Sequence, residues 1–177
     1  TYVALAAARV AAEPAPDPAR RVVVPPRGRA DAGAKAVTVA RSLLTKAGFA
    51  GIEDDVAVRD LGLDVTFRAR DTTGAPWLFE LAGAFSVTRP GLKRADVLWR
   101  SLGKAAVLDA ARRSDGPRGD LGPLVLLSTD APAASSAGGR ALRAVTGPGR
   151  PVHDVITLGD PAGATRLQAL AGRTAMP

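Results

Sequence analysis

Two acidic residues on neighbouring predicted strands have the types and spacing to do chemistry. Asp64 lies on the polar side of an alternating segment, residues 63–70, and Glu80 interrupts an apolar segment, residues 77–81. Hydrolysis of a phosphodiester needs a hard cation that polarises a phosphoryl oxygen and activates water, and Mg²⁺ or Mn²⁺ takes carboxylate ligands for this purpose. We therefore expect Asp64 and Glu80, facing one side of a sheet, to hold one divalent metal ion.

The apolar surroundings of Glu80 allow a second interpretation. A carboxylate inside such a strand costs free energy unless it is paired or binds a metal. Arg68 or Arg70 on the preceding strand could pair with Glu80 across the two strands, which would contribute about 0.2–1 kcal/mol. Metal binding and the cross-strand ion pair are both open on the sequence.

Basic side chains gather after the second acidic segment. The chain has 24 Lys and Arg against 17 acidic residues, a net charge of +7 and a pI near 10.9. High-GC coding raises Arg together with Ala, Gly and Pro, so the excess has a compositional explanation as well. Guanidinium groups bind phosphate in a bidentate way, and neutralised phosphates release counterions. We expect a DNA-binding surface made of Arg89, Lys93, Arg94, Arg100 and Lys104.

Other catalytic arrangements find little support. The chain has no Cys, which removes thiol nucleophiles and thiolate metal sites and fits a reducing, cytoplasmic setting. His153 is the only His, which argues against catalytic triads and His-based metal sites. The run Glu53–Asp54–Asp55 is typical of surface acids before a strand, and Gly138–Gly139–Arg140 of a flexible loop.

The periodicity of the chain predicts one α/β domain over residues 34–177. Residues 1–33 are expected to form a short helix (3–12) and a basic, Pro-rich linker. Helices are predicted at 34–47, 93–113 (the longest), 140–145 and 164–171, and strands at 56–58, 63–70, 77–81, 124–128 and 152–158. The first three strands suit an antiparallel meander, and the long helix then brings the next strand in parallel. The result is a mixed central sheet flanked by helices.

This element order and the two acids resemble the PD-(D/E)XK, or restriction-endonuclease-like, nuclease superfamily. Its core is αβββαβ, with an acidic residue on the second strand and an acidic-x-Lys motif on the third. Asp64 and Glu80 occupy these positions with fifteen residues between them, a spacing that the family commonly shows. The resemblance covers roughly residues 34–128. It departs at Ala82, where the family usually has Lys.

The resemblance implies a DNA endonuclease-type domain that depends on Mg²⁺ or Mn²⁺, within a larger DNA-processing or restriction protein. Since the family includes members in which the Lys has moved, Lys104 on the long helix is expected to serve as the missing catalytic cation beside Asp64 and Glu80. Asp96, Arg100 and Lys104 share one helical stripe. The alternative is that this stripe is a solvated face with an Asp96–Arg100 pair.

Two other functional classes stay open. One is a catalytically degenerate, DNA-binding module of the same fold, which Ala82 favours, and the other is a basic scaffold domain that binds an acidic protein. The start at Thr1 rather than Met indicates a piece of a longer protein, and a homodimer is compatible with the sequence. No apolar run is long enough to cross a membrane and no secretory leader is visible, so a cytoplasmic location is expected.

Overall fold

The computed structural model describes residues 27–83, 91–114 and 121–172, which form a five-stranded mixed sheet and four α-helices. The helices are α2 (Arg27–Ala47), α3 (Ala95–Arg113), α4 (Ala137–Val145) and α5 (Pro161–Leu170). The strands are β1 (Ala50–Val58), β2 (Leu63–Arg70), β3 (Pro76–Ala82), β4 (Leu124–Ser128) and β5 (Asp154–Thr157). Two short 3₁₀ helices, η1 (Arg59–Leu61) and η2 (Gly91–Lys93), complete the set.

The strands follow one another across the sheet in chain order, β1 to β5. The first three are antiparallel, and β3, β4 and β5 are parallel. In the β2–β3 hairpin, Phe67 lies opposite Phe79. Helix α3 makes the crossover from β3 to β4, which right-handed parallel connections require. The predicted meander, the parallel fourth strand and the mixed sheet are therefore confirmed.

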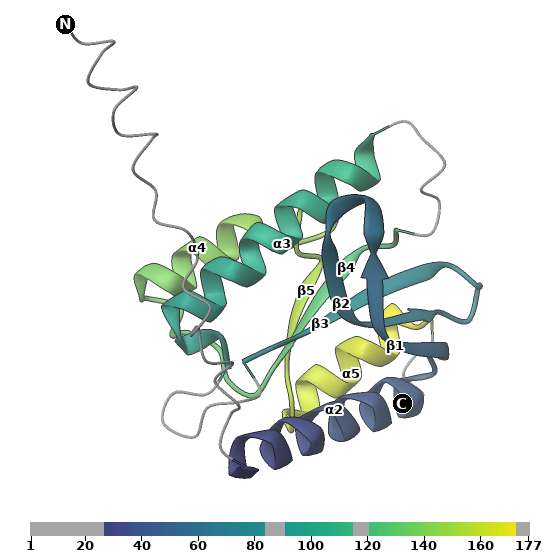
Figure 1. The fold of residues 1–177 in the computed structure, drawn as a ribbon, viewed down its shortest axis with the longest axis horizontal. Helices are drawn as coiled ribbons and strands as arrows, with labels where there is room; N and C mark the ends of the chain where they lie inside the picture. The colour runs from purple at the N-terminus through teal and green to yellow at the C-terminus, as the bar shows by residue number, and fades with distance from the viewer. Residues whose placement is uncertain (1–26, 84–90, 115–120, 173–177) are drawn as a thin grey trace, which may run out of the picture.

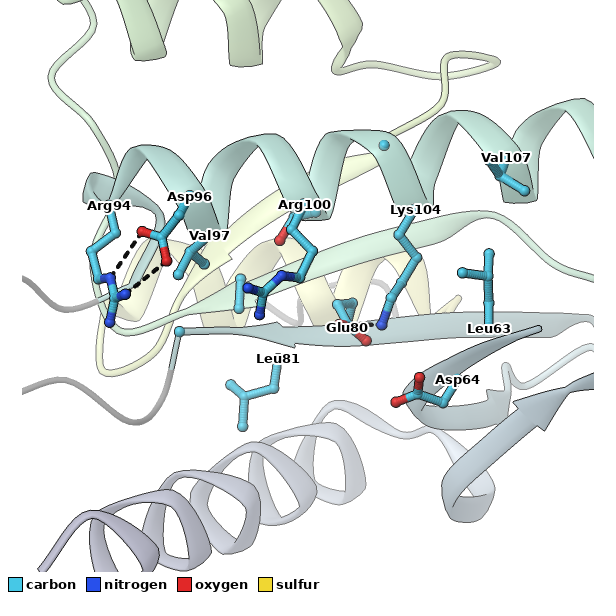
Figure 2. A pocket seen from close by; sticks show the side chains of 14 residues that line it. Leu63, Asp64, Glu80, Leu81, Arg94, Asp96, Val97, Arg100, Lys104 and Val107 are labelled. Carbon is cyan, nitrogen blue, oxygen red and sulfur yellow. Dashed lines mark hydrogen bonds and ion pairs between the residues drawn. The ribbon is translucent and has the colours of Figure 1, made fainter. Parts of the chain in front are cut away.

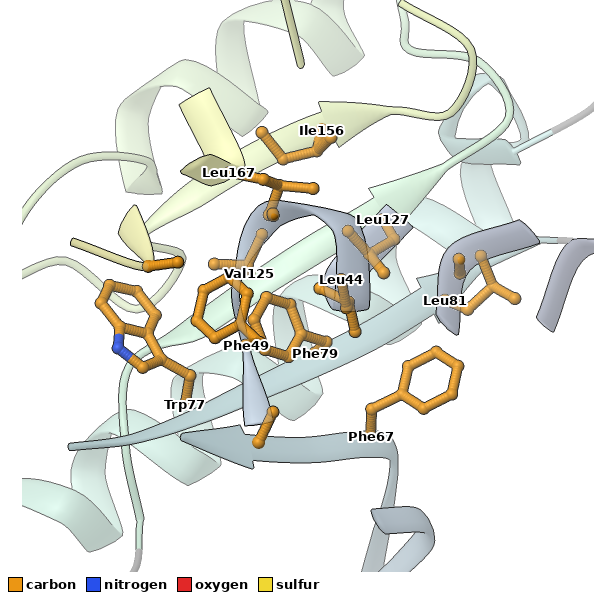
Figure 3. Close-up of a cluster of buried hydrophobic side chains, with 14 residues drawn as sticks. Leu44, Phe49, Phe67, Trp77, Phe79, Leu81, Val125, Leu127, Ile156 and Leu167 are labelled. Atoms are coloured by element: carbon orange, nitrogen blue, oxygen red, sulfur yellow. The ribbon is translucent and has the colours of Figure 1, made fainter. Parts of the chain in front are cut away.

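Helices cover both faces of the sheet, with α2 and α5 on one side and α3 and α4 on the other (Figure 1). The first face buries an aromatic cluster in which the Phe49 and Phe79 rings meet edge to face, 4.9 Å apart (Figure 3). The second face buries Leu98, Leu102 and Ala105 of α3 against the sheet. All five residues of β4 are buried, as expected of a central parallel strand.

Helix α3 differs from its prediction in two respects. It begins at Ala95 rather than at Lys93, because Gly91–Lys93 forms η2, and with 19 residues it is shorter than α2, which has 21. Its inner face includes Leu108, and Ala106 is exposed.

The other boundaries shift by a few residues. Helix α2 begins at Arg27 rather than at residue 34, inside the predicted linker, and the predicted helix at 3–12 lies outside the described residues. The residue types Gly28 and Gly33 concealed this earlier start. Strand β1 is longer than residues 56–58 and contains the acidic run, so these acids are strand residues, with a bulge near Glu53. None of the described helices is long and apolar enough to cross a membrane.

Candidate functional site

The sheet forks where the β2–β3 ladder ends. The last backbone pair is Phe67 with Phe79; beyond it, the start of β2 pairs with β1 alone and the end of β3 pairs with β4 alone. We call this point the fork. Val65 and Phe67, two residues apart, pack into the clusters on opposite faces of the sheet. The inward side of β2 therefore changes from one face of the sheet to the other where β2 separates from β3.

Side chains replace the backbone ladder at the fork. The Thr66 N–H donates to Glu80 Oε2 at 3.2 Å, and the Thr66 hydroxyl lies 3.3 Å from the same oxygen. The Leu81 N–H donates to Thr66 Oγ1 at 2.9 Å. These bonds satisfy backbone groups that the separated strands would otherwise leave unpaired. Thr66 is a site residue that sequence reasoning missed, although its place opposite Glu80 follows from the hairpin register.

Lys104 reaches Glu80 from α3. Its Nζ donates to Glu80 Oε1 at 2.6 Å, and the two side chains are only 12% and 15% exposed (Figure 2). Such a short, charge-assisted bond in a partly buried place is stronger than a surface ion pair. The expected approach of Lys104 to the acid is confirmed as geometry. The cross-strand alternative was wrong, since Arg68 pairs instead with Glu53 at 2.7 Å.

Asp64 and Arg100 face the same space as the Glu80–Lys104 pair (Figure 2). Both are exposed, and no hydrogen bond or ion pair of either side chain occurs within the part of the chain that the structure describes. Together they border a pocket of about 750 Å³, the fork pocket. It is lined by Leu63, Asp64, Glu80, Leu81, Ala82, Gly83, Arg94, Asp96, Val97, Arg100, Ser101, Gly103, Lys104 and Val107.

The basic residues at the start of α3 have acidic partners. Arg94 makes a two-bond contact with Asp96, at 2.7 and 3.1 Å, and its hydrogen bonds and charge lower the pKa of Asp96. Lys93 binds Asp130 at 2.5 Å, and this hydrogen bond lowers the pKa of Asp130. The predicted Asp96–Arg100 pair was wrong, because Arg94 is nearer in the turn before the helix.

The five predicted DNA-binding residues thus fall into three groups. Arg100 and Lys104 line the fork pocket, and Arg94 lies at its edge (Figure 2). Lys93 lies beside a different, smaller hollow next to Ser136. Arg89 lies outside the described residues.

The other candidate groups occupy structural positions. In the acidic run of β1, Glu53 pairs with Arg68 and Asp54 pairs with Arg41. His153 meets the edge of Trp77, with ring centroids 4.9 Å apart. Within residues 27–83, 91–114 and 121–172, no three acids or His side chains come together as a metal cluster.

The donor set at the fork fits one divalent cation. Mg²⁺ is commonly held by one or two carboxylates together with water and substrate phosphate. The carboxylate of Asp64 has no partner in the described structure, and Glu80 Oε1 accepts a single hydrogen bond, so that oxygen retains a lone pair. Two carboxylates lie within the range that Mg²⁺ commonly uses.

Comparison of the chain with protein-family models, with curated proteins and with solved structures found no match. The residues and geometry of the fork pocket are therefore the basis on which a function is assigned.

Proposed function

We propose that this domain is a metal-dependent DNA nuclease of PD-(D/E)XK type, with its active site in the fork pocket. The observation that carries the proposal is the 2.6 Å Glu80–Lys104 pair in a pocket that also contains the free carboxylate of Asp64. Two acids from adjacent strands and one Lys are the charges that phosphodiester hydrolysis uses. The resemblance in element order and acid spacing supports the same reaction.

Lys104 takes the place of the Lys that the family carries on the third strand. Ala82 lines the same pocket as Lys104, so the position that lacks the Lys faces the space that Lys104 enters from α3. A fixed ammonium group there stabilises the negative charge that develops on the phosphate in the transition state. Arg100, four residues before Lys104, is free to bind a neighbouring phosphate oxygen.

Asp64 and Glu80 would hold Mg²⁺ or Mn²⁺, which supplies a Lewis acid and an activated water when bound. Thr66 and Lys104 orient the Glu80 carboxylate through three hydrogen bonds, so the acid keeps one rotamer. A preorganised ligand of this kind costs little reorganisation during the reaction. A longer chain that contains this domain would process DNA in the cytoplasm.

One observation favours a second candidate, a DNA-binding module without catalysis. Both oxygens of Glu80 already hold donors from the protein. The pair could therefore be a structural salt bridge that holds α3 against β3, while Arg100 and the basic edge of the pocket bind DNA.

Cleavage assays on plasmid and on single-stranded DNA, with Mg²⁺, Mn²⁺ or EDTA, distinguish the two candidates. We expect metal-dependent cutting that Asp64→Asn and Glu80→Gln abolish and that Lys104→Met slows by about 10²–10³-fold. Glu53→Gln and Lys46→Met are the matched controls, because they remove the same charges from exposed positions outside the pocket. Both controls should cut like the wild type.

A wild type that cuts nothing, and that shows no calorimetric metal binding sensitive to Asp64→Asn, would refute the nuclease. DNA binding that survives in that protein would identify the non-catalytic module. Denaturation curves of each variant show whether a loss of cutting reflects a loss of fold, which matters most for Lys104→Met, since it leaves Glu80 partly buried without its cation.

A further inference from the structure

One exposed aromatic side chain lies on α3 beside the fork pocket. Trp99 is 61% exposed, and the other large apolar residues so exposed in the described structure are Val39 at 52% and Val107 at 45%. Trp buries more surface than other side chains when a partner covers it, which is why it is enriched at binding sites. The nuclease mechanism above gives Trp99 no role.

The position of Trp99 on the helix places it at the edge of the pocket. Asp96, Arg100 and Gly103 all line the pocket, and they lie three residues before, one after and four after Trp99. Residues three and four apart share a helix face, so Trp99, which is not itself a lining residue, lies on α3 next to the lining residues Asp96 and Gly103. A Cβ at Gly103 would meet no atom within 4 Å, so the surface beside the indole is open.

The charge around Trp99 favours a nucleic acid over a protein partner. Three acids and three basic residues line the pocket, and the pairs Arg94–Asp96 and Lys104–Glu80 take up two of the basic residues. Arg100, the residue after Trp99, has no such partner in the described structure, and the whole chain carries +7. The exposed apolar surface is not continuous, since Trp99 and Val107 are two helical turns apart with Gly103 between them. Protein interfaces need larger contiguous apolar patches. An exposed aromatic ring beside an unpaired Arg suits a base that stacks while its phosphate is bound nearby.

We propose that Trp99 stacks on an unpaired nucleobase, and that the preferred ligand of the fork pocket is therefore single-stranded DNA. A base inside a duplex already stacks on its neighbours and offers no free face to the indole. With the base on Trp99, the adjoining phosphate lies within reach of Arg100, and the strand continues toward Glu80 and Lys104. This assignment rests on the proposed function only in that the pocket accepts a DNA backbone.

The test measures binding in EDTA, so that no cleavage is needed. Fluorescence anisotropy compares a short single strand, a duplex, and an abasic strand with the same number of phosphates, for the full chain and for Trp99→Ala, Trp99→Phe and Val39→Ala. We expect Trp99→Ala to weaken binding to the single strand by about tenfold or more, and Trp99→Phe to retain most of the affinity. Val39→Ala, which removes an exposed apolar side chain from α2 on the opposite face of the sheet, should change nothing.

Three results would overturn the assignment. The first is that wild type and Trp99→Ala bind the single strand with equal affinity. The second is that Trp99→Ala loses as much affinity for the abasic strand as it does for the intact single strand. The third is a dimer in sedimentation experiments that Trp99→Ala dissociates, since a second copy would then cover the indole. The stacking role of Trp99 and the nuclease proposal can fail separately. If the domain binds single-stranded DNA through its bases but does not cut it, only the nuclease proposal fails. If the domain cuts DNA and Trp99→Ala cuts equally well, only the stacking role fails. Binding of no DNA at all refutes both.

Discussion

Glu80 is the residue on which the site depends. It stands on the α3 side of β3, between Leu78 and Ala82, both of which belong to the apolar cluster on that face. Its carboxylate is acceptable there because Thr66 and Lys104 satisfy it. Removal of one partner from such a group typically costs about 1–3 kcal/mol. The same contacts hold the carboxylate in one place, as both a catalytic carboxylate and a structural salt bridge require.

The environment of His153 makes the free energy of unfolding depend on pH. Burial lowers the pKa of His153; the carboxylate of Asp154 opposes this effect, and the Arg112 charge adds to it. The unfolded chain therefore takes up a proton at higher pH than the folded chain, so stability is lost as the pH falls below the ordinary His pKa of about 6.5. Urea denaturation between about pH 7.5 and 5.5 should show a falling free energy of unfolding, and His153→Gln should flatten this fall.

The acids with lowered pKa do not disturb this measurement. Hydrogen bonds from Thr73, Trp77 and Ala75 outweigh the opposing effect of burial and hold the pKa of Asp71 below its usual value. Such a carboxylate contributes its full stabilisation of the folded state above the pKa of the unfolded chain, near 3.8. This contribution is lost only as the pH falls below that value. An unchanged pH dependence in His153→Gln would show that another group controls it.

At the scale of elements, the site depends on how β3 and α3 are joined. After residues 84–90, η2 is tied to the end of β4, because the Leu92 N–H donates to Asp130 O at 3.0 Å and to Ser128 Oγ at 3.1 Å. This anchor sets where α3 begins, and hence the position of Lys104, nine residues after Ala95. The fork opens β2 from β3, and α3 covers the opening.

Two glycine substitutions test the anchor. Gly91 has a φ of +65°, and a Cβ there would overlap Ser128 Oγ and Asp130 O, whereas Gly74 has a φ of +85° with open space around it. We expect Gly74→Ala to cost only the backbone strain, about 1–2 kcal/mol. Gly91→Ala should cost about 3 kcal/mol or more, because the anchor must also move. Urea denaturation measures both, and equal losses would show that the η2 anchor contributes little.

At the scale of the whole molecule, some basic side chains are paired with acids and others are free to bind a ligand. The described ion pairs engage Lys93 and Arg94 with acids, and Arg41 and Arg166 likewise. A paired cation must exchange a carboxylate for a phosphate, so it gains less from DNA than a free one. Arg100 has no such partner in the described structure, and it therefore should contribute most among the basic residues of α3.

The salt dependence of DNA binding tests this view. Each phosphate contact contributes about 0.9 to the slope of log K against log salt concentration on duplex DNA. Arg100→Ala should weaken binding to all sequences and reduce that slope by about one contact. Arg41→Ala, on the opposite face of the sheet and paired with Asp54, is the control and should leave the slope unchanged. A slope that Arg100→Ala does not alter would place the DNA elsewhere.

The sequence by itself determined the element order and the β2–β3 hairpin whose strands carry Asp64 and Glu80. These features follow from local signals: the alternation over residues 63–70, the turn at Asp71 to Gly74, and the apolar strand around Glu80. A hairpin of known turn has a known register, so neighbours within it can be predicted. The starts of α2, β1 and α3 were misplaced because glycines and acidic runs are ambiguous outside their tertiary setting.

The partner of Glu80 and the fork were decided by the tertiary structure. Lys104 lies 24 residues beyond Glu80, and its direction depends on the rotation of α3, which the burial of Leu98, Leu102 and Ala105 sets. Arg68 and Arg70 were equally plausible partners on the sequence, because periodicity does not show that Glu53 takes Arg68. Periodicity describes one element at a time, and the fork pocket exists only where two strands and a helix meet.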